Sequence, residues 1–356
     1  MFGFVVENKF LNHYIRRRTT KQNRRNANGT EQKNAAEGSR YIAKKTPAQR
    51  VVREVKRQWP YWIMMLPGLA LLITFCYVTL PGVLIAFKDY NAVDGIFGSA
   101  WMDPWYKNFE FFFKSDVSKT ITFNTLFYNV IEMVTVTVSA VALAILLYEV
   151  KNRFVSATYK GAVLLPTFLS WIVIQYIVYA LLSTDRGIVN NIITANGGVA
   201  LEWYSTPWYW RIIMPLAYLW KNVGYYSVYY VAAIAGINSD YYEAAQLDGA
   251  SKWQEVKYIT IPMLKPIIII LSLLWVGNLF RGGLGDWMGF MNITNNSALL
   301  YSATDVVDTY VYRALKSMYD YGMSTAVGLY QSIIGFVLVV ASNWVIRRID
   351  PDSALF

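Results

Sequence analysis

The hydrophobic positions along the chain form six apolar stretches, each close to the roughly 20 residues that cross a bilayer as a helix. Inside hydrocarbon no water is available to bond free backbone groups, so stretches of this length are expected to be helical. The stretches are residues 61–87, 121–148, 160–182, 212–236, 263–281 and 325–346. The sequence therefore predicts an all-α, polytopic membrane protein with six transmembrane helices.

Basic residues between the stretches predict their orientation. With the N-terminus inside, the segments 149–159 and 237–262 and both chain ends face the cytoplasm, and these segments hold most of the Lys and Arg. The opposite loops nearly balance their few basic residues with Asp and Glu. This asymmetry favours an N-in/C-in arrangement, since an even number of spans places both ends on the same side.

The charge is concentrated before the first span. Residues 1–60 carry 15 Lys/Arg against 4 Asp/Glu, whereas the other 296 residues carry 18 against 19. We expect residues 1–45 to be a basic, flexible cytoplasmic tail and residues 46–59 an amphipathic helix at the inner membrane surface. The alternative for residues 46–59 is a solvated basic leader whose only role is to fix the orientation of the first span. Residues 60–350 would form the membrane domain and 351–356 a short C-terminal tail.

Composition excludes several classes of protein. The chain has 55% hydrophobic and only 16% charged residues, well below the roughly 25% charged residues of soluble proteins. Cys76 and His13 are each the single residue of their kind, so neither a disulfide within the chain nor a zinc site built on cysteines is expected. A basic tail almost without aromatic residues does not predict nucleic-acid binding.

The loop NSDYYEAAQLDGASKWQEVKYITIPMLKP, residues 238–266, predicts two short helices joined by a sharp turn. Asp240 with Glu243 and Ser251 with Gln254 have the spacing of capping boxes. Gly249 between them can adopt a conformation that a side chain would disfavour. Such a hairpin suits contact with another protein, although an ordinary amphipathic connector remains the alternative.

This loop resembles the signature of permease subunits from binding-protein-dependent importers, in the order Glu-Ala-Ala, three residues, Gly, nine residues, Ile-x-Leu-Pro. The one departure is Ile261, where Leu is usual. Similarity to the oligosaccharide-type permeases of the carbohydrate-uptake family continues over residues 60–356, for example in LPGLALLITF, LLPTFLSWIV and STAVGLYQS. The GGLGDWMGFMNI stretch departs from the Gly-Phe-Asp-Gln pattern expected nearby, which weakens any assignment of substrate.

The resemblance implies a type I ABC importer permease fold in the bacterial plasma membrane. Its expected partners are a second, non-identical permease subunit, a cytosolic ATPase dimer, an extracellular solute-binding protein and a carbohydrate, with an oligosaccharide as the expected kind. Residues 238–262 would contact the ATPase as a coupling loop, and closure of the ATPase dimer would switch the helices between inward- and outward-facing states. The residues that the family pattern assigns to coupling are Glu243, Ala244, Ala245, Asp248, Gly249, Ile259 and Pro262.

The chain itself is not expected to be an enzyme or to bind a cofactor or metal. The sequence contains no G-x-x-x-x-G-K-[ST] loop, so ATP and Mg would be bound by the ATPase partner. A membrane enzyme or a secondary transporter would require catalytic constellations or intramembrane carboxylates in related halves, which the sequence does not show. A permease-like scaffold or sensor that does not transport keeps the same loop and stays an alternative.

Polar and aromatic residues within two spans are candidates for a substrate path. Sugars combine apolar C–H faces with hydroxyls, so aromatic rings beside amides suit them. Packing between helices is the alternative for each residue. The candidates, at helical spacing in spans four and five, are Tyr218, Asn222, Tyr225, Tyr229, Ser272, Trp275 and Asn278. Glu132 and Lys221 should face protein or water, or Lys221 could extend to the outer interface.

Overall fold

The computed structural model describes residues 47–280 and 287–349, which are almost entirely helical. The predicted tails 1–45 and 351–356, and part of the GGLGDWMGFMNI stretch, lie outside the described residues. The chain divides into two units, residues 1–78 and 79–356, and each is described by itself.

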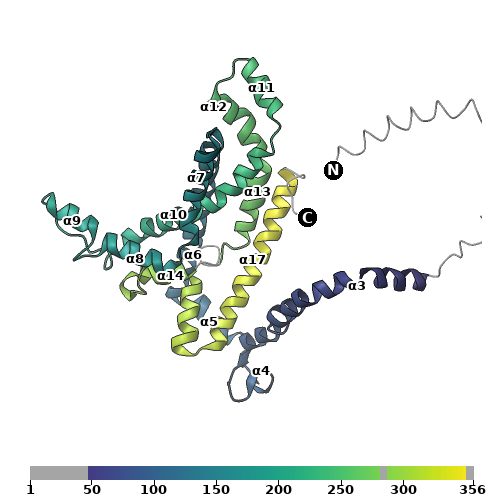
Figure 1. The fold of residues 1–356 in the computed structure, drawn as a ribbon. Coiled ribbons are helices and arrows are strands. Elements are labelled where there is room, and N and C mark those ends of the chain that lie inside the picture. The colour runs from purple at the N-terminus through teal and green to yellow at the C-terminus, as the bar shows by residue number, and fades with distance from the viewer. Residues whose placement is uncertain (1–46, 281–286, 350–356) are drawn as a thin grey trace, which may run out of the picture. The chain divides into compact units, whose positions relative to one another are not determined.

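The first unit is a single long helix. Helix α3, Pro47–Leu72, continues into a π-helical segment at Ile73–Tyr77 (Figure 1). It begins at a proline, which suits a first turn because the amide there needs no partner. Residues 47–59 of the predicted surface helix and residues 61–77 of the first apolar stretch therefore belong to one helix, whereas residues 80–87 of that stretch form a separate 3-10 helix. That residues 46–59 lie on the membrane surface stays a prediction.

The second unit opens with short elements. A 3-10 helix, Leu80–Phe87, leads into strand β1, Lys88–Asp89, which pairs antiparallel with β2, Ala100–Trp101. Helices α4, Gly95–Gly98, and α5, Lys107–Lys114, complete this region. Lys88 Nζ donates hydrogen bonds to the carbonyls of Phe97 at 3.1 Å and Ser99 at 2.9 Å, which closes the loop on itself.

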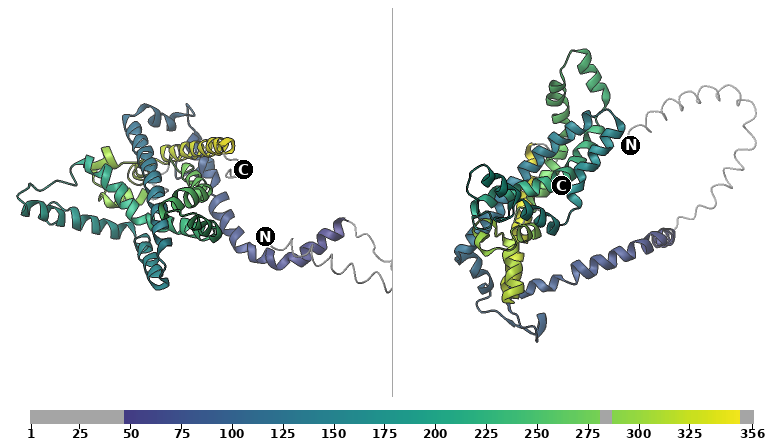
Figure 2. Two further views of the ribbon diagram at one scale, coloured as in Figure 1. Left: turned by 90° about the horizontal axis from the view of Figure 1, so that it is seen from above. Right: turned by 60° about the vertical axis from the view of Figure 1, so that its left-hand side comes forward.

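Four long helices form the body of the second unit. They are α6, Asp116–Glu149; α10, Pro207–Ala235; α13, Ile261–Val276; and α17, Tyr321–Ile349. Helix α6 packs along α10, and α13 packs against α17, as the two further views show (Figure 2). Shorter helices connect them: α7, Arg153–Leu164; α8, Trp171–Leu182; α9, Ile188–Ala195; α11, Ser239–Leu247; α12, Lys252–Glu255; α14, Trp287–Ile293; α15, Tyr301–Thr304; and α16, Val307–Arg313.

Within the described residues, four helices are long and apolar enough to span a membrane: Gln58–Phe87, Asp116–Glu149, Lys252–Val276 and Tyr321–Arg348. A bent pair, Arg153–Phe168 with Trp171–Leu182, would make a fifth. Helix α10 is 29 residues long but falls outside this set, since its tyrosines, amides and charged residues make it less apolar. The protein is thus an all-α, multi-pass membrane protein, while the six-helix count and the N-in/C-in orientation stay predictions.

The predicted third span, 160–182, is not one straight helix. The chain bends by 94° between Phe168 and Trp171. Pro166 lies in a 3-10 turn, Leu165–Phe168, and Leu169 adopts an extended conformation. Ser170 then caps the next helix by accepting a hydrogen bond from Val173 N at 3.4 Å. A proline followed by a capping serine explains why the helix stops and restarts here.

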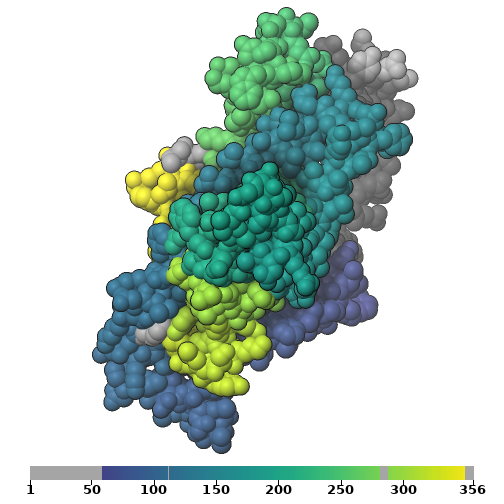
Figure 3. Space-filling model, turned by 90° about the vertical axis from the view of Figure 1, so that its left-hand side faces the viewer, coloured from purple at the N-terminus to yellow at the C-terminus, as the bar shows by residue number. Residues whose placement is uncertain are grey.

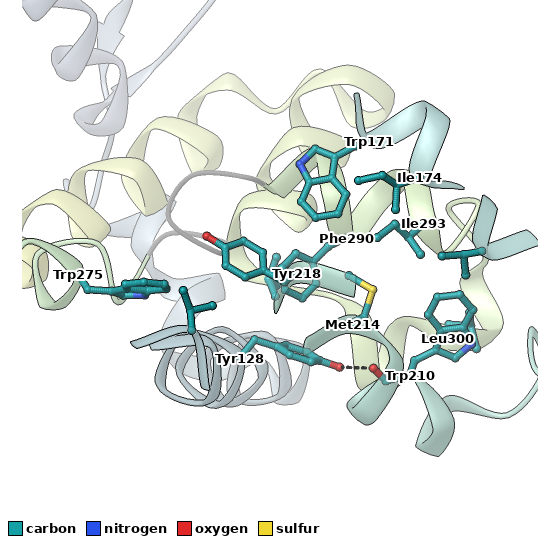
Figure 4. Close-up of a cluster of buried hydrophobic side chains, with 13 residues drawn as sticks. Tyr128, Trp171, Ile174, Trp210, Met214, Tyr218, Trp275, Phe290, Ile293 and Leu300 are labelled. Atoms are coloured by element: carbon teal, nitrogen blue, oxygen red, sulfur yellow. Dashed lines mark hydrogen bonds between the residues drawn. The ribbon is translucent and has the colours of Figure 1, made fainter. Parts of the chain in front are cut away.

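The largest cluster of buried apolar side chains lies where α6, α8, α10, α13 and α14 meet (Figure 4). Tyr128 and Trp210 are completely buried in it. The Tyr128 hydroxyl donates to the Ala303 carbonyl at 2.8 Å, and Asn124 Nδ2 donates to the Asp305 carbonyl at 3.0 Å. The polar face of α6 thereby holds the connection between α14 and α16, because these buried carbonyls need donors.

Candidate functional site

Helices α11 and α12 form a hairpin that projects beyond the long helices carrying it (Figures 1 and 3). The first helix is capped by Asn238, whose Oδ1 accepts a hydrogen bond from Asp240 N at 3.1 Å. The predicted capping box of Asp240 with Glu243 is therefore wrong, because the helix begins two residues earlier than that box requires. The Ser251–Gln254 capping box is confirmed, with Ser251 N donating to Gln254 Oε1 at 2.7 Å.

Gly249 makes the turn of the hairpin. Its φ is +81°, a conformation that costs an L-residue roughly 1–2 kcal/mol. No heavy atom lies within 4 Å of where a Cβ would stand, so backbone conformation alone favours glycine here. Asp248 precedes it as the C-cap of α11. The sharp turn predicted from the sequence is present.

The second arm of the hairpin is not an isolated short helix. Helix α12 continues through a π-helical segment, Val256–Thr260, into α13, so that Lys252–Val276 is one helix. The predicted coupling residues therefore fall into two places. Glu243, Ala244, Ala245, Asp248 and Gly249 lie on the hairpin itself, whereas Ile259 and Pro262 lie where it joins the long helix.

Exposed apolar side chains, which the motif did not single out, surround the tip of the hairpin. Leu247 is 90% exposed and Trp253 is 71% exposed, and Tyr241 is also exposed. Glu243 and Ala244 are exposed between them. Large apolar residues in an otherwise polar loop were the available signal in the sequence. Tyrosine and tryptophan exposed in this way are typical of surfaces that bind another protein.

Charged and polar side chains fasten the hairpin to the end of α6. Lys252 Nζ lies 2.6 Å from Glu255 Oε2 and 3.8 Å from Glu149 Oε1. Gln246 Nε2 donates to Glu255 Oε1 at 3.0 Å, which also ties the two arms together. Glu149, Lys252 and Glu255 also line a cavity of about 320 Å³ at the base of the hairpin. We name Glu149, Lys252 and Glu255 the hairpin clamp.

The predicted substrate-path residues separate into buried and exposed sets. Tyr218 is 4% exposed and Trp275 2% exposed, and their ring centroids lie 6.4 Å apart within the apolar cluster (Figure 4). Tyr225 and Tyr229 are exposed, and their hydroxyl oxygens lie 2.7 Å apart. Tyr226, which the sequence pattern passed over, connects the two sets by ring contacts with Tyr229 and Trp275.

The amides of the predicted path bond to their own helices. Asn222 Nδ2 donates to the Tyr218 carbonyl at 3.1 Å, and Asn278 Nδ2 donates to the Leu274 carbonyl at 3.0 Å. Both side chains, like Ser272, are half-buried. These contacts fit packing within the helices, and a role in binding stays a prediction.

Lys221 points into the protein. Its side chain is buried, and Nζ donates to the carbonyls of Thr167 at 3.0 Å and Leu169 at 2.6 Å. The alternative in which Lys221 extends to the outer interface is therefore wrong. Glu132 is completely buried in α6, as expected for an intramembrane carboxylate that faces protein. Within the described residues, no three His, Cys, Asp or Glu side chains are grouped to hold a metal ion.

Comparison with known families gives a match over residues 124–353, more than half of the chain, to the family described as binding-protein-dependent transport system inner membrane component. The chain belongs to this family. The polygalacturonan/rhamnogalacturonan transport system permease protein YteP of Bacillus subtilis (strain 168) is 28% identical over 312 residues, covering 88% of this chain and 95% of that protein. Protein LplB of the same organism is 29% identical over 299 residues, or 84% and 92% of the two chains.

A solved relative has the same fold. A crystal structure of a bacterial alginate ABC transporter, in complex with an alginate pentasaccharide-bound periplasmic protein, contains a chain that is 28% identical. The match has a TM-score of 0.74 and covers 84% of this chain and 98% of that one. The type I ABC importer permease fold expected for this permease is thus confirmed. So is its place among inner-membrane transport components.

Proposed function

We propose that this chain is a permease subunit of an ATP-driven importer and forms half of the membrane pathway for an oligosaccharide. Family membership supports the transport role. YteP belongs to a polygalacturonan/rhamnogalacturonan transport system and the solved relative to an alginate transporter, which supports a carbohydrate substrate. A second permease subunit, an ATPase dimer and a solute-binding protein would complete the complex.

The observation that carries the proposal is the exposed hairpin at the end of one continuous helix. Its tip presents Glu243, Ala244 and Leu247 to a partner, and its second arm continues without a break from Lys252 to Val276. A cytosolic ATPase that gripped the tip would therefore pull directly on a membrane helix. We assign Glu243 and the Gly249 turn to that contact, with Leu247 and Trp253 as its apolar part.

On the substrate side, a row of aromatic rings supports sugar passage. Ring contacts run from Tyr229 through Tyr226 and Trp275 to Tyr218 and Trp171, with successive centroids 5.1–6.4 Å apart. Aromatic planes of this kind offer apolar faces to the C–H faces of sugars. We assign the exposed end of the row, at Tyr225 and Tyr229, to the first contact with the sugar.

The test uses the complete complex reconstituted in lipid vesicles with its ATPase and binding protein. Sugar-loaded binding protein is expected to stimulate ATP hydrolysis and to drive uptake. Hydrolysis that needs this subunit but ignores the binding protein would contradict the proposal. A single cysteine placed at Leu247, in a Cys76→Ser background, should crosslink to the ATPase and to no external protein.

A further inference from the structure

A polar pocket is formed mostly by residues that lie between helices α13 and α17 in the chain. It has a volume of about 480 Å³, within the range of pockets that hold small ligands. Its walls come from α8, from the end of α14 and the turn after it, and from the end of α16 with the π-helical segment Ala314–Met318 that follows it. The polar residues that line it are Gln175, Asn292, Asn295, Asn296, Tyr312, Arg313, Lys316 and Ser317. We name it the Lys316 pocket.

The pocket lies at the far end of the helix that carries the hairpin. The helix Lys252–Val276 begins at the hairpin and is 25 residues long, or about 37 Å. Apart from Gln175 on α8, the pocket residues follow that helix and precede α17, which returns toward the hairpin side (Figure 1). Helix α14, which contributes Asn292 to the pocket, lies away from the hairpin in the same view.

The amides of the pocket are held in place by their neighbours. Asn295 and Asn296 have φ of 55° and 49°, and asparagine tolerates this left-handed region better than most residues. Gln175 Nε2 donates to Asn295 Oδ1 at 3.1 Å, and the Tyr301 hydroxyl donates to Asn296 Oδ1 at 3.1 Å. Each primary amide has two donors and an acceptor, so capacity remains for the hydroxyls of a sugar.

The pocket is positively charged. Arg313 is paired with Asp305 through Nη1 and Oδ1 at 2.9 Å, and its guanidinium lies 4.0 Å from the centre of the Tyr301 ring. Burial lowers the pKa of Arg313, but the hydrogen bonds and charge of Asp305 raise it by more, so the group stays cationic.

Lys316 supplies the uncompensated charge. Its Nζ donates to the neutral Tyr312 hydroxyl at 3.0 Å, and within the described part of the chain no carboxylate pairs with it or lines the pocket. That hydrogen bond also raises the pKa of Lys316 above its ordinary value. An exposed ammonium beside four amides is an arrangement that suits an anion bearing hydroxyl groups.

We propose that the Lys316 pocket binds a carboxylate-bearing sugar residue, a uronate, with Lys316 paired to its carboxylate and the four amides bonded to its hydroxyls. This inference rests on the proposed function and narrows its substrate to acidic oligosaccharides. Arg313 is already paired with Asp305, so it contributes to the local electrostatic potential. Lys316 makes the direct contact with the uronate carboxylate. Neutral oligosaccharides would lack the charge-assisted contact and bind more weakly.

The test measures binding to the assembled complex in lipid nanodiscs, without the binding protein, by saturation-transfer difference NMR. The probes are trigalacturonate and its trimethyl ester, in which an uncharged methyl ester replaces each carboxylate. The intact complex should bind the acid about tenfold more tightly than the ester. Lys316→Gln should reduce acid binding to the level of the ester and leave ester binding unchanged. Lys114→Gln is the matched control, since this exposed lysine of α5 does not line the pocket.

Three outcomes would overturn the inference. In the first, acid and ester bind equally, or neither binds. In the second, Lys316→Gln leaves the preference for the acid unchanged. In the third, Lys316→Gln weakens docking of the binding protein and does not change binding of either sugar, so the pocket is a contact for the binding protein. If the complex takes up a neutral oligosaccharide with ATP, and Lys316→Gln does not change that uptake, the importer function stands and the uronate site is contradicted. Absence of uptake for every sugar would instead remove the proposed function.

Discussion

Lys221 Nζ donates a 2.6 Å hydrogen bond to the carbonyl of Leu169, 52 residues earlier in the chain, at the point where the third apolar stretch bends. The bend leaves carbonyls at the end of a 3-10 turn without helical partners, and buried carbonyls require donors. Thr167 Oγ1 returns a hydrogen bond to the Lys221 carbonyl at 2.9 Å, so the two segments are joined in both directions. A lysine from α10 thus completes the broken helix.

Lys221→Met should destabilise this bend. Loss of the ammonium leaves the partly buried Thr167 and Leu169 carbonyls without their donor, which costs about 1–3 kcal/mol of unfolding free energy. Hydrogen–deuterium exchange of residues 165–175 in the assembled complex should increase, with a lower melting temperature. Lys221→Arg retains donors and should lose less. Unchanged hydrogen–deuterium exchange in the Lys221→Met variant would mean that the bend is stable without the hydrogen bonds of Lys221.

Gly249→Val should separate ATP hydrolysis from uptake. For a β-branched residue, a φ of +81° costs about 1–2 kcal/mol or more. The turn would therefore distort to avoid this conformation. Membrane insertion and assembly with the second permease should persist. Gly249→Asn is the control, because asparagine visits this conformation more readily. Wild-type uptake and hydrolysis in the Val variant would contradict the role given to the turn.

Gly224→Ala should impair packing of α10 against α7. A Cβ at this position would press on the carbonyl oxygen of Val163 and lie 2.8 Å from its Cγ1, so backbone would have to move. Overpacking of this kind costs about 1–3 kcal/mol. Gly328→Ala in α17 is the matched control, since no atom lies within 4 Å of its added Cβ. Thermal melting of the purified complex should fall only for Gly224→Ala; equal melting of the two variants would refute the close contact.

Lys252→Met should weaken the hairpin clamp modestly. Lys252 is 60% exposed, so solvent screens its ion pairs and their loss costs less than about 1 kcal/mol. The expected result is a small fall in sugar imported per ATP, and wild-type protein should approach the same ratio at high salt because the attraction is screened. Lys257→Met, an exposed lysine outside the clamp, should retain the normal ratio. A ratio insensitive to both the substitution and salt would exclude the clamp from energy transfer.

Local sequence signals predicted the elements that local chemistry determines. The turn at Gly249 and the capping box at Ser251 follow from residues within five positions of each other, and the structure contains both. The long apolar runs predicted α6 and α17 within a few residues of their ends. Asn238 replaced Asp240 as the cap because both residue types cap well, and only the geometry of the preceding turn decides between them.

Contacts between distant segments could not be predicted in the same way. LLPTFLSWIV reads as one apolar run, and although Pro166 is a helix breaker, membrane helices tolerate proline when neighbours satisfy the freed groups. The partner that decides the outcome is Lys221 on another helix. Likewise, helical spacing selected Tyr218, Tyr225 and Tyr229 but passed over Tyr226, whose ring lies 5.1 Å from that of Trp275 and so links Trp275 to the exposed tyrosines.

The helix from Lys252 to Val276 is continuous, so in the proposed complex a force applied to the hairpin would move the helix along its whole length. Over about 37 Å, a tilt of about 10° about one end would carry the other end through about 6 Å. That displacement exceeds the diameter of a water molecule and approaches the width of a sugar ring. A small rocking of the hairpin is therefore enough to open or seal a passage at the far membrane face.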